Sequence, residues 1–368
     1  MSTARTPLAV ALMNPFFWPE VRRGSERLMH DLAVDLLSLG DRPRVITSHP
    51  GRPGTTVEDG FPVVRNWRPP EKPLTLRSVE PHLSHVPFSY RSLARGEDDV
   101  AHAFYPTDAL AALRWGRRTG RPSIFSYMGI PSRQVLARNR LRKTILEQAI
   151  AETDAVTALS RAARDGLWRW FGVEAPVVYP GVDLAAFSPG GRRAEHPTVA
   201  CAGAADDGRK RIGLLVRAFA LVRAQRPSAR LLLTRPDAPE LARELDEQPG
   251  VELVPKEHSV EAMFQEAWAT GLASRDEAFG LVLVESMACG TPVFGAREGG
   301  IPEIVDRPEV GRLFDGDDER EVARTVLETL ELAEDPGTAA ACRARAEAFD
   351  TLSGARAYSD LYRQLIAG

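Results

Sequence analysis

The sequence predicts an α/β protein built from two parallel-sheet domains. Short apolar strands alternate with helical stretches along most of the chain, and the alternation stops once, at FSPGGRRAEHP (187–197), before it restarts. Such alternation is typical of parallel sheets with helices on both faces. At 368 residues the chain is long for one hydrophobic core, so two domains of ordinary size fit its length.

The elements follow from short apolar runs and their glycine and proline boundaries. A first helix is expected at 24–39, where Gly40 ends it, and strands are expected at 8–13, 44–47, 100–102, 124–127, 155–158 and 177–178. After the linker we expect a helix at 212–224 and strands at 198–203, 231–233, 293–296 and 311–314. The segment 354–367 has apolar residues at helical spacing and predicts an amphipathic helix. The region 69–99 lacks periodicity and predicts a long loop.

Composition excludes several classes of protein. Hydrophobic content of 43% and charged content of 26% are average for a soluble domain, and a net charge of −3 gives no general attraction to nucleic acid. The three cysteines, Cys201, Cys289 and Cys342, lack metal-ligand spacing, which favours buried thiols in a reducing cytoplasm. No apolar run approaches the roughly 18–20 residues of a membrane span, and the start is too short for a signal peptide. We therefore expect a cytoplasmic protein.

The stretch 275–305 carries the strongest functional signal. Gly280–Cys289 predicts a buried helix, because Gly290-Thr291-Pro292 caps its end and prevents continuation. Glu285 then lies in the second turn, where a carboxylate is costly to bury unless it faces a polar ligand or the mouth of a cleft. The N–H groups at the helix start and the Gly299-Gly300 turn both suit an anion.

This pattern resembles the nucleotide-sugar site of retaining GT-B glycosyltransferases of the family 4 type. Glu277 and Glu285 are eight positions apart with Phe279-Gly280 between them, and CGTPV and GGIPE follow. The alternative is an ordinary strand–helix–strand unit with two solvated glutamates. The joint spacing of the pieces favours the functional interpretation, which structural context must confirm.

The resemblance implies a role for each matching residue. Glu285 would hold the ribose hydroxyls and Glu277 the hydroxyls of the donor sugar. The backbone around the following residues would contact the sugar and the diphosphate: Phe279, Gly280, Leu281, Val282, Gly299 and Gly300.

The resemblance also implies a domain plan, the GT-B arrangement of two Rossmann-like domains facing a cleft. Residues 1–186 would form the acceptor domain, 187–349 the nucleotide-sugar donor domain, and 350–368 a final helix that returns to the first domain. VYPGVDLAAFSP (178–189) resembles the interdomain signature of the family. We interpret it as a hinge with an Asx-type cap from Asp183 and no chemical role.

The loop that contains Gly203 carries three basic residues further along the chain, Arg209, Lys210 and Arg211. Fixed cations stabilise a diphosphate leaving group as its charge develops. The resembled family usually has an arginine directly after the glycine, where this chain has Ala204, so Arg209 and Lys210 become the candidate pair. A solvated basic turn is the alternative.

Near the N-terminus, Gly24 matches one glycine of the family's loop that faces the donor phosphate, and Arg23 replaces the other. Gly24 is a candidate donor contact, and Ser25 is a candidate N-cap of the helix that follows. Capping alone is an alternative for this loop.

Two histidines common in the family are missing. His102 falls inside a strand, so we interpret it as a hydrogen-bonded core residue, and the second place reads SYMG (126–129). The resemblance implies retention, with the departing phosphate taking the acceptor's proton, so no histidine base is required. Tyr105, Asp108 or Tyr127 are candidates to position the sugar instead.

Two charged segments have plain alternatives. Asp315–Asp318 looks like a metal-binding pair but is better explained as a turn and cap, and with Arg209 and Lys210 present we expect no metal and no cofactor. Arg133–Lys143 concentrates cations that could touch an anionic membrane surface, at the inner face, or a phosphorylated acceptor. The solvated face of a packing helix is the preferred interpretation.

The leading hypothesis is a retaining, metal-independent glycosyltransferase. It would move a sugar from a nucleoside-diphosphate donor to a hydroxyl on a small-molecule, lipid-linked or glycan acceptor. Two alternatives remain: a nucleotide-sugar epimerase or phosphorylase of the same architecture, and a catalytically inactive nucleotide-sugar-binding partner. Donor-consumption assays with and without an acceptor distinguish the first alternative from a transferase. Nucleotide binding without any donor hydrolysis would favour the second.

Overall fold

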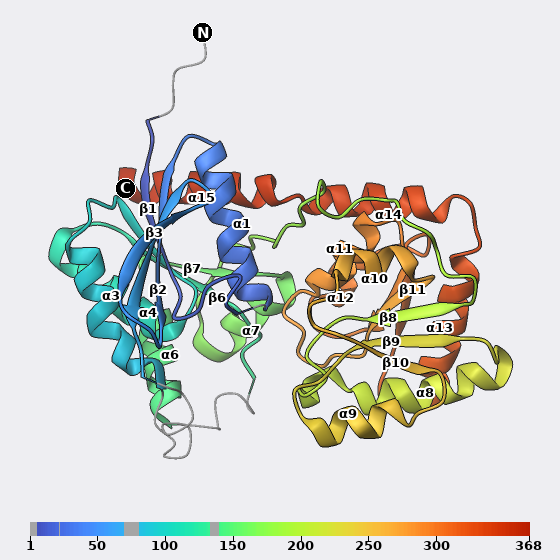
Figure 1. Cartoon of the computed structure of the whole chain (residues 1–368). Coiled ribbons are helices and arrows are strands. Elements are labelled where there is room, and N and C mark those ends of the chain that lie inside the picture. Colours follow the sequence, from blue (N-terminus) through green and yellow to red (C-terminus); the bar gives the residue numbers. More distant parts are fainter. Residues whose placement is uncertain (1–5, 22, 70–80, 133–139) are drawn as a thin grey trace, which may run out of the picture. The chain divides into compact units, whose positions relative to one another are not determined.

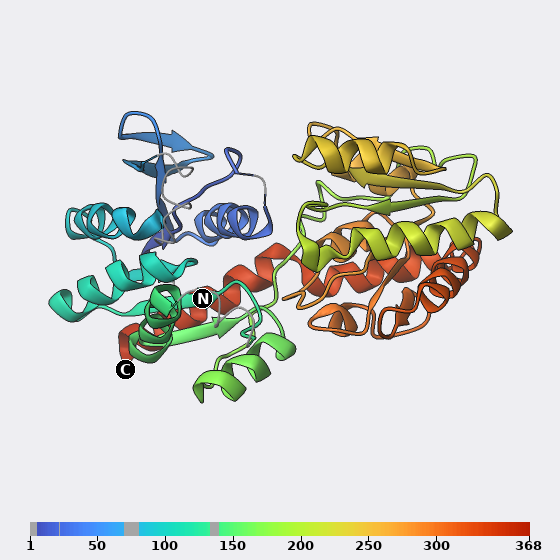
Figure 2. The same ribbon diagram turned by 90° about the horizontal axis from the view of Figure 1, so that it is seen from below.

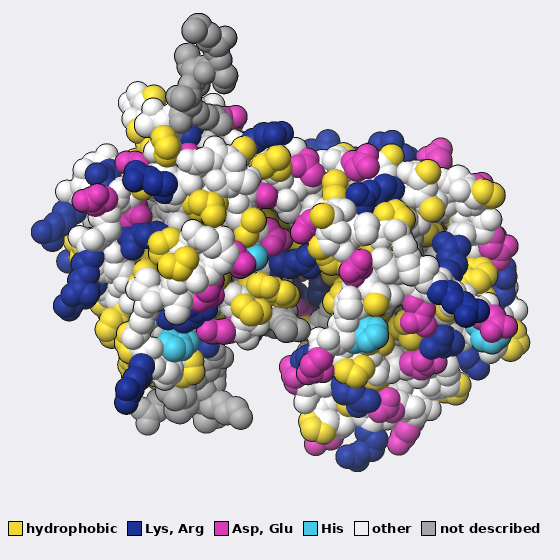
Figure 3. Space-filling model, turned by 45° about the horizontal axis from the view of Figure 1, so that its top comes forward, with side chains coloured by type: hydrophobic (Ala, Val, Ile, Leu, Met, Phe, Trp, Pro, Cys, Tyr) yellow, Lys and Arg dark blue, Asp and Glu magenta, His cyan; other side chains and the backbone are white. Residues whose placement is uncertain are grey.

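The chain forms two compact units, Met1–Gly181 with Thr351–Gly368 (unit 1) and Val182–Asp350 (unit 2). The computed structural model describes residues 6–21, 23–69, 81–132 and 140–368. Each unit has one sheet with helices on both faces (Figure 1, Figure 2). The predicted α/β class with two parallel sheets is confirmed. Acidic and basic side chains intermix over the face shown in Figure 3, in keeping with the small net charge.

The sheet of unit 1 has the strand order β3-β4-β2-β1-β5-β6-β7, and every neighbouring pair is parallel except β3 and β4. Its strands are β1 (Ala9–Met13), β2 (Arg42–His49), β3 (Gly54–Glu58), β4 (Phe61–Trp67), β5 (Val100–Ala103), β6 (Ser123–Tyr127) and β7 (Ala155–Ala158). The side chains of β1 alternate between the two cores, with Ala11 and Met13 in one and Val10 and Leu12 in the other.

The helices of unit 1 divide between these two cores. Those described are α1 (Gly24–Ser38), η1 (Pro81–Ser84), α3 (His85–Ala94), α4 (Pro106–Thr119), α6 (Arg140–Glu152), α7 (Arg161–Phe171) and α15 (Thr351–Ala367). Residues of α3, α4, α6 and α7 fill one core, and residues of α1 and α15 fill the other. The last helix of the chain thus packs beside the first (Figure 1).

Three features of unit 1 differ from the sequence-based prediction. The β3–β4 hairpin was not expected; it turns at Asp59-Gly60, where both residues have positive φ, as a two-residue hairpin turn requires. The long loop predicted at 69–99 is wrong in its described part, which forms η1 and α3, while residues 70–80 lie outside the described residues. The strand predicted at 177–178 is only a single bridge between Val177 and Ala158.

The sheet of unit 2 is entirely parallel, with the order β10-β9-β8-β11-β12-β13. Its strands are β8 (Thr198–Cys201), β9 (Arg230–Thr234), β10 (Val251–Val254), β11 (Ala269–Leu272), β12 (Val293–Ala296) and β13 (Gly311–Phe314). On one face α8 (Ile212–Gln225) packs on α13 (Glu319–Leu332), and α9 (Pro239–Asp246) lies against β10. On the other, α11 (Leu281–Ala288) packs on α10 (Val260–Glu266) and α14 (Thr338–Ala346), near α12 (Ile301–Ile304) (Figure 1). Short turns η2 (Gly208–Lys210) and η3 (Glu347–Phe349) complete the unit.

Two smaller predictions about buried groups are confirmed. All three cysteines are free and buried, and burial raises the pKa of Cys201 to about 11. His102 is fully buried in β5, where its ring bonds to the Tyr362 hydroxyl of α15 at 2.7 Å and to the Ser126 hydroxyl of β6 at 2.6 Å. It is a core residue that ties α15 to the sheet.

Candidate active site

The predicted site residues of unit 2 gather where the strand order reverses. From β8 the chain goes first to β9 on one side and later to β11 on the other, so the loops after β8 and β11 leave the sheet next to each other. In open parallel sheets this switch point, at the carboxyl ends of the strands, is where ligands bind. The first loop carries Lys210 and the second carries Glu277.

Lys210 and Glu277 meet across this switch point. The Lys210 ammonium lies 2.6 Å from the Glu277 carboxylate, and the side chains are 22% and 18% exposed, so the pair is shielded yet reachable. The two loops are also joined through backbone, because the Arg275 N–H donates to the Arg209 carbonyl at 2.8 Å. Gly203 lies beside the lysine: a Cβ built there would stand 3.9 Å from the Lys210 Cε.

Gly299 and Gly300 bring a third loop, after β12, directly onto the backbone of the Glu277 loop. The Gly300 N–H donates to the Glu277 carbonyl at 2.9 Å. A Cβ at Gly299 would lie 2.2 Å from that carbonyl oxygen, and one at Gly300 would lie 2.7 Å from the Ala278 carbonyl oxygen. Only glycine permits this approach, so the pair shapes the site through its backbone.

The helix α11 begins as predicted, after Gly280 in the left-handed conformation at φ +107°, and no side chain caps its start. The amides of Leu281 and Val282 belong to the first turn, which has no intrahelical acceptors. Phe279, just before, is buried and packs edge-on against Phe349 at 5.3 Å. Glu285 follows in the second turn and is 4% exposed. Past the helix, Gly290 has φ +83°, in agreement with its predicted capping role.

The three basic residues of the β8 loop point to different partners. Arg209 is 58% exposed and pairs with Asp207 at 2.6 Å, a hydrogen bond that raises the pKa of Arg209. Arg211 is nearly buried, and its guanidinium donates to the Ala273 carbonyl and to Asp317 and stacks on Phe314. Only Lys210 of the three reaches Glu277.

Arg211 is therefore a supporting residue that sequence reasoning missed. It fastens the loop after β8 to the end of β11 and to the loop after β13, and it does so at φ +52°, a left-handed conformation that is rare for arginine. In the sequence the three consecutive basic residues look alike, so nothing indicated that Arg211 would be the buried one.

We predict that Gly299→Ala destabilises unit 2 more than a positive φ alone explains. Its Cβ would collide with the Glu277 carbonyl oxygen, whereas Gly316, at φ +68°, has nothing within 4 Å of a built Cβ. Both alanines carry the left-handed penalty of about 1–2 kcal/mol, and overpacking should add about 1–3 kcal/mol at Gly299 alone. Urea unfolding of Gly299→Ala beside Gly316→Ala measures the difference, and equal losses would contradict the close approach.

The remaining predicted donor contact, Gly24, is the first residue of α1 in unit 1, and a Cβ built there meets nothing within 4 Å. The suggestion that Ser25 caps this helix is wrong. Arg23 is the N-cap residue and no side chain caps it, while the Ser25 hydroxyl lies inside the helix and donates to the Glu26 carboxylate at 2.9 Å.

Family models match both units. Residues 22–186 match the model described as Glycosyltransferase Family 4, and residues 196–332 match the model described as Glycosyl transferases group 1. The chain belongs to the family 4 glycosyltransferases.

Curated relatives in the family include D-inositol 3-phosphate glycosyltransferases. That of Corynebacterium kroppenstedtii is 31% identical over 255 residues, covering 61% of this chain and 56% of the relative. That of Mycolicibacterium vanbaalenii is 35% identical over 192 residues, covering 44% and 41%. The chain thus spans about half the length of the curated relatives it matches.

Solved structures confirm the GT-B fold. Sucrose-phosphate synthase from Thermosynechococcus elongatus superimposes with a TM-score of 0.82 at 22% identity, covering 98% of this chain and 99% of that one. HepE from Anabaena in complex with UDP-glucose has a TM-score of 0.74 at 17% identity, covering 97% and 100%. At these identities the likeness concerns the fold alone.

The three candidates for positioning the sugar lie at the carboxyl edge of the unit 1 sheet. Tyr105 is the N-cap residue of α4, Asp108 is fully buried in the first turn of that helix, and Tyr127 ends β6 with little exposure. Asp183, in the interdomain signature, accepts hydrogen bonds from the amides of Ala185 and Ala186, which confirms the predicted Asx-type cap.

The aspartates at 315–318 also act as turn and cap residues. Asp318 caps α13 by accepting from the Arg320 amide at 3.0 Å, Asp317 pairs with Arg211 and Arg275, and Asp315 pairs with Arg297. Within the described ranges no group of three or more His, Cys, Asp or Glu residues could hold a metal ion.

The cationic segment Arg133–Lys143 is described only in part, since residues 133–139 lie outside the described residues. Arg140–Lys143 open α6 with exposed side chains, and Lys143 forms an i,i+4 pair with Glu147 at 3.4 Å. Across the described part of the chain, no helix is long and apolar enough to cross a membrane.

Proposed function

We propose that this chain is a retaining glycosyltransferase that moves a sugar from a nucleoside-diphosphate donor to a hydroxyl group. Unit 2 binds the donor and unit 1 binds the acceptor. Membership of family 4 supports the reaction class, and the relatives named above share about half their length with this chain.

One observation carries the proposal: the Lys210–Glu277 pair at the switch point of the unit 2 sheet. The pair lies beside the start of α11, which no side chain caps. It also lies beside the Gly299-Gly300 turn, whose backbone approaches the Glu277 loop closely. The ammonium, the amides and the close backbone suit a negatively charged diphosphate, and the carboxylate suits the hydroxyls of the donor.

In this proposal Lys210 stabilises the diphosphate as it departs. Breaking the glycosidic bond leaves extra negative charge on the phosphate, so a cation fixed beforehand lowers the barrier without reorganisation. Glu277 holds the ammonium in place and accepts from hydroxyls of the donor sugar, and Glu285 accepts from the ribose hydroxyls. Arg209 is a second and weaker cation because it faces Asp207. The departing phosphate takes the proton of the acceptor hydroxyl.

The backbone completes the donor site. The amides of residues 279–282 and the turn at Gly299-Gly300 contact the sugar and the diphosphate, and Gly203 leaves room for the lysine stem. None of these contacts needs a metal ion or another cofactor.

A panel of UDP, GDP and TDP in thermal-shift binding tests the donor class, and UDP-glucose with D-inositol 3-phosphate is the first transfer assay. UDP-glucose is the ligand of the HepE complex, and D-inositol 3-phosphate is the substrate after which the curated relatives are named. Transfer with the donor's anomeric configuration kept in the product is the expected result. Donor consumption that does not depend on any acceptor would favour the epimerase or phosphorylase alternative.

We predict that the two glutamates affect different constants. Glu285→Gln should weaken UDP binding about 10- to 100-fold, because a carboxylate accepting from two hydroxyls is worth about 1.5–3 kcal/mol. Glu277→Ala should mainly lower kcat, since its partners are the sugar and Lys210. Calorimetry with UDP and steady-state kinetics measure the two effects, and negligible changes in both variants would refute the assignment.

A further inference from the structure

His82 lies at the switch point of the other sheet, in unit 1. There the strand order reverses between β1 and β5, and Phe16 and Tyr105 follow these strands. The His82 ring stands edge-on to both aromatic rings, with centroids 4.9 Å from Phe16 and 5.1 Å from Tyr105. A histidine from η1 is thus clamped where a ligand of this unit is expected to bind.

The His82 side chain is 9% exposed, yet its ring nitrogens form no hydrogen bond with any described residue of the chain. Imidazole nitrogens that no described group of the chain engages are available to hydrogen-bond a bound ligand. Burial lowers the pKa of His82 to about 4, against the opposing influence of the Asp108 carboxylate. The ring is therefore neutral near pH 7.

A neutral imidazole donates from one nitrogen and accepts at the other. A hydroxyl group has the same two abilities and fits it better than an anion, which only accepts. The chemistry of the ring therefore favours a ligand with several hydroxyls.

A buried network of hydrogen bonds joins the helices next to His82. The Asp108 carboxylate accepts from the Ser89 hydroxyl at 2.9 Å and lies 3.1 Å from His85 Nδ1, and the His85 Nε2 side bonds to the Thr47 carbonyl at 3.2 Å. The other Asp108 oxygen is buried without a hydrogen-bond partner among the described residues. The network ties α3, which follows η1 directly, to the start of α4 and to β2.

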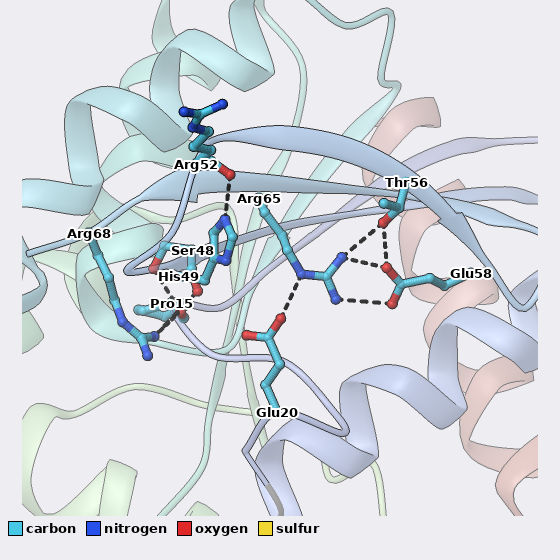
Figure 4. A network of polar contacts seen from close by, with 9 residues as sticks. All are labelled: Pro15, Glu20, Ser48, His49, Arg52, Thr56, Glu58, Arg65 and Arg68. Carbon is cyan, nitrogen blue, oxygen red and sulfur yellow. Dashed lines mark hydrogen bonds and ion pairs between the residues drawn. The ribbon is translucent and has the colours of Figure 1, made fainter. Parts of the chain in front are cut away.

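Cations border the same place. The guanidinium groups of Arg68 and Arg23 lie over the Phe16 ring at 4.6 and 5.4 Å. Arg68 is oriented by the carbonyls of Pro15 and Ser48, as Figure 4 shows. An acceptor with a negative substituent next to its hydroxyls would be favoured here.

We propose that His82 is a positioning residue for the acceptor, binding a hydroxyl of a polyol such as a sugar or a cyclitol. This rests on the proposed transferase function and deepens it. The Phe16 and Tyr105 rings hold the imidazole in one orientation, so one acceptor hydroxyl is fixed relative to the carboxyl edge of the sheet.

Kinetics with UDP-glucose and D-inositol 3-phosphate test the role. His82→Ala should raise the KM for the acceptor about tenfold, the usual value of one neutral hydrogen bond, and should leave UDP affinity unchanged. His82→Gln, which can still donate and accept, should recover most of the loss. The matched control is His49→Ala, because the His49 ring is already bonded to the Arg52 carbonyl at 2.7 Å (Figure 4).

A direct measurement covers the case in which this acceptor does not react or the alanine variant misfolds. With UDP bound, the imidazole NMR signals of His82, assigned through His82→Gln, are followed while D-inositol 3-phosphate, myo-inositol or glucose is added. Shifts at His82 but not at His49 support the proposal. No shift with any of the three, or equal KM changes in both alanine variants, overturns it. Failure of the wild-type chain to bind any nucleotide would instead refute the transferase function.

Discussion

Lys210→Met is expected to lower kcat by about two to three orders of magnitude, the usual loss when one fixed group that stabilises transition-state charge is removed. Methionine keeps the length of the stem beside Gly203 and removes only the ammonium that lies 2.6 Å from Glu277. The loss should appear mostly in kcat, because the charge matters most when the diphosphate departs. Steady-state kinetics with UDP-glucose, together with UDP calorimetry, measure it.

Arg209→Met is the matched control for this variant. It removes a neighbouring cation of the same loop, whose side chain is 58% exposed and is already paired with Asp207. We expect a decrease in kcat of less than about threefold, since exposed pairs contribute little. An equal decrease in both variants would mean that the net charge of the loop matters rather than the position of Lys210, and an unchanged kcat in Lys210→Met would remove the basis of the proposed mechanism.

The elements of this site could be predicted because their signals are local. Gly280 starts α11 and Gly290 follows it, and the strand at 293–296 and the Gly299-Gly300 turn come within ten residues. A short stretch of sequence therefore contains both the helix that holds Glu285 and the turn that packs on the Glu277 loop. Lys210 lies 67 positions before Glu277 in the sequence, and the pairing of the two depends on the order of strands in the sheet.

The features that were missed depend on partners far along the chain. Arg211 is buried because of Ala273 and Asp317, and His82 acquires its setting from Phe16 and Tyr105, all distant in sequence. The β3–β4 hairpin is different, since the Asp59-Gly60 pair is a recognised two-residue turn signal that the sequence did contain. The helix α3 was obscured by the prolines and serines of its region.

Asp41→Ala is expected to cost about 3–5 kcal/mol of unfolding free energy, the usual result of removing one partner from a buried charged pair. The Asp41 carboxylate is almost fully buried and accepts from the Leu8 amide at 2.9 Å, the Ser359 hydroxyl at 2.7 Å and the Arg363 guanidinium at 2.8 Å. Alanine would leave these three donors without an acceptor. The last two belong to α15, so this one side chain joins the two ends of the chain.

The helices that lose hydrogen-exchange protection first show why the Asp41→Ala variant is less stable. Hydrogen exchange should rise first in the amides of α15 and α1, which pack together, because the carboxylate holds α15 at the start of β1 and β2. Asp360→Ala, on the exposed side of the same helix, should stay within about 0.5 kcal/mol of the wild type. If Asp41→Ala unfolds in urea as the wild type does, or if α15 keeps its protection, then the helix is held by the packing of Tyr358 and Tyr362 in the core and not by the buried carboxylate.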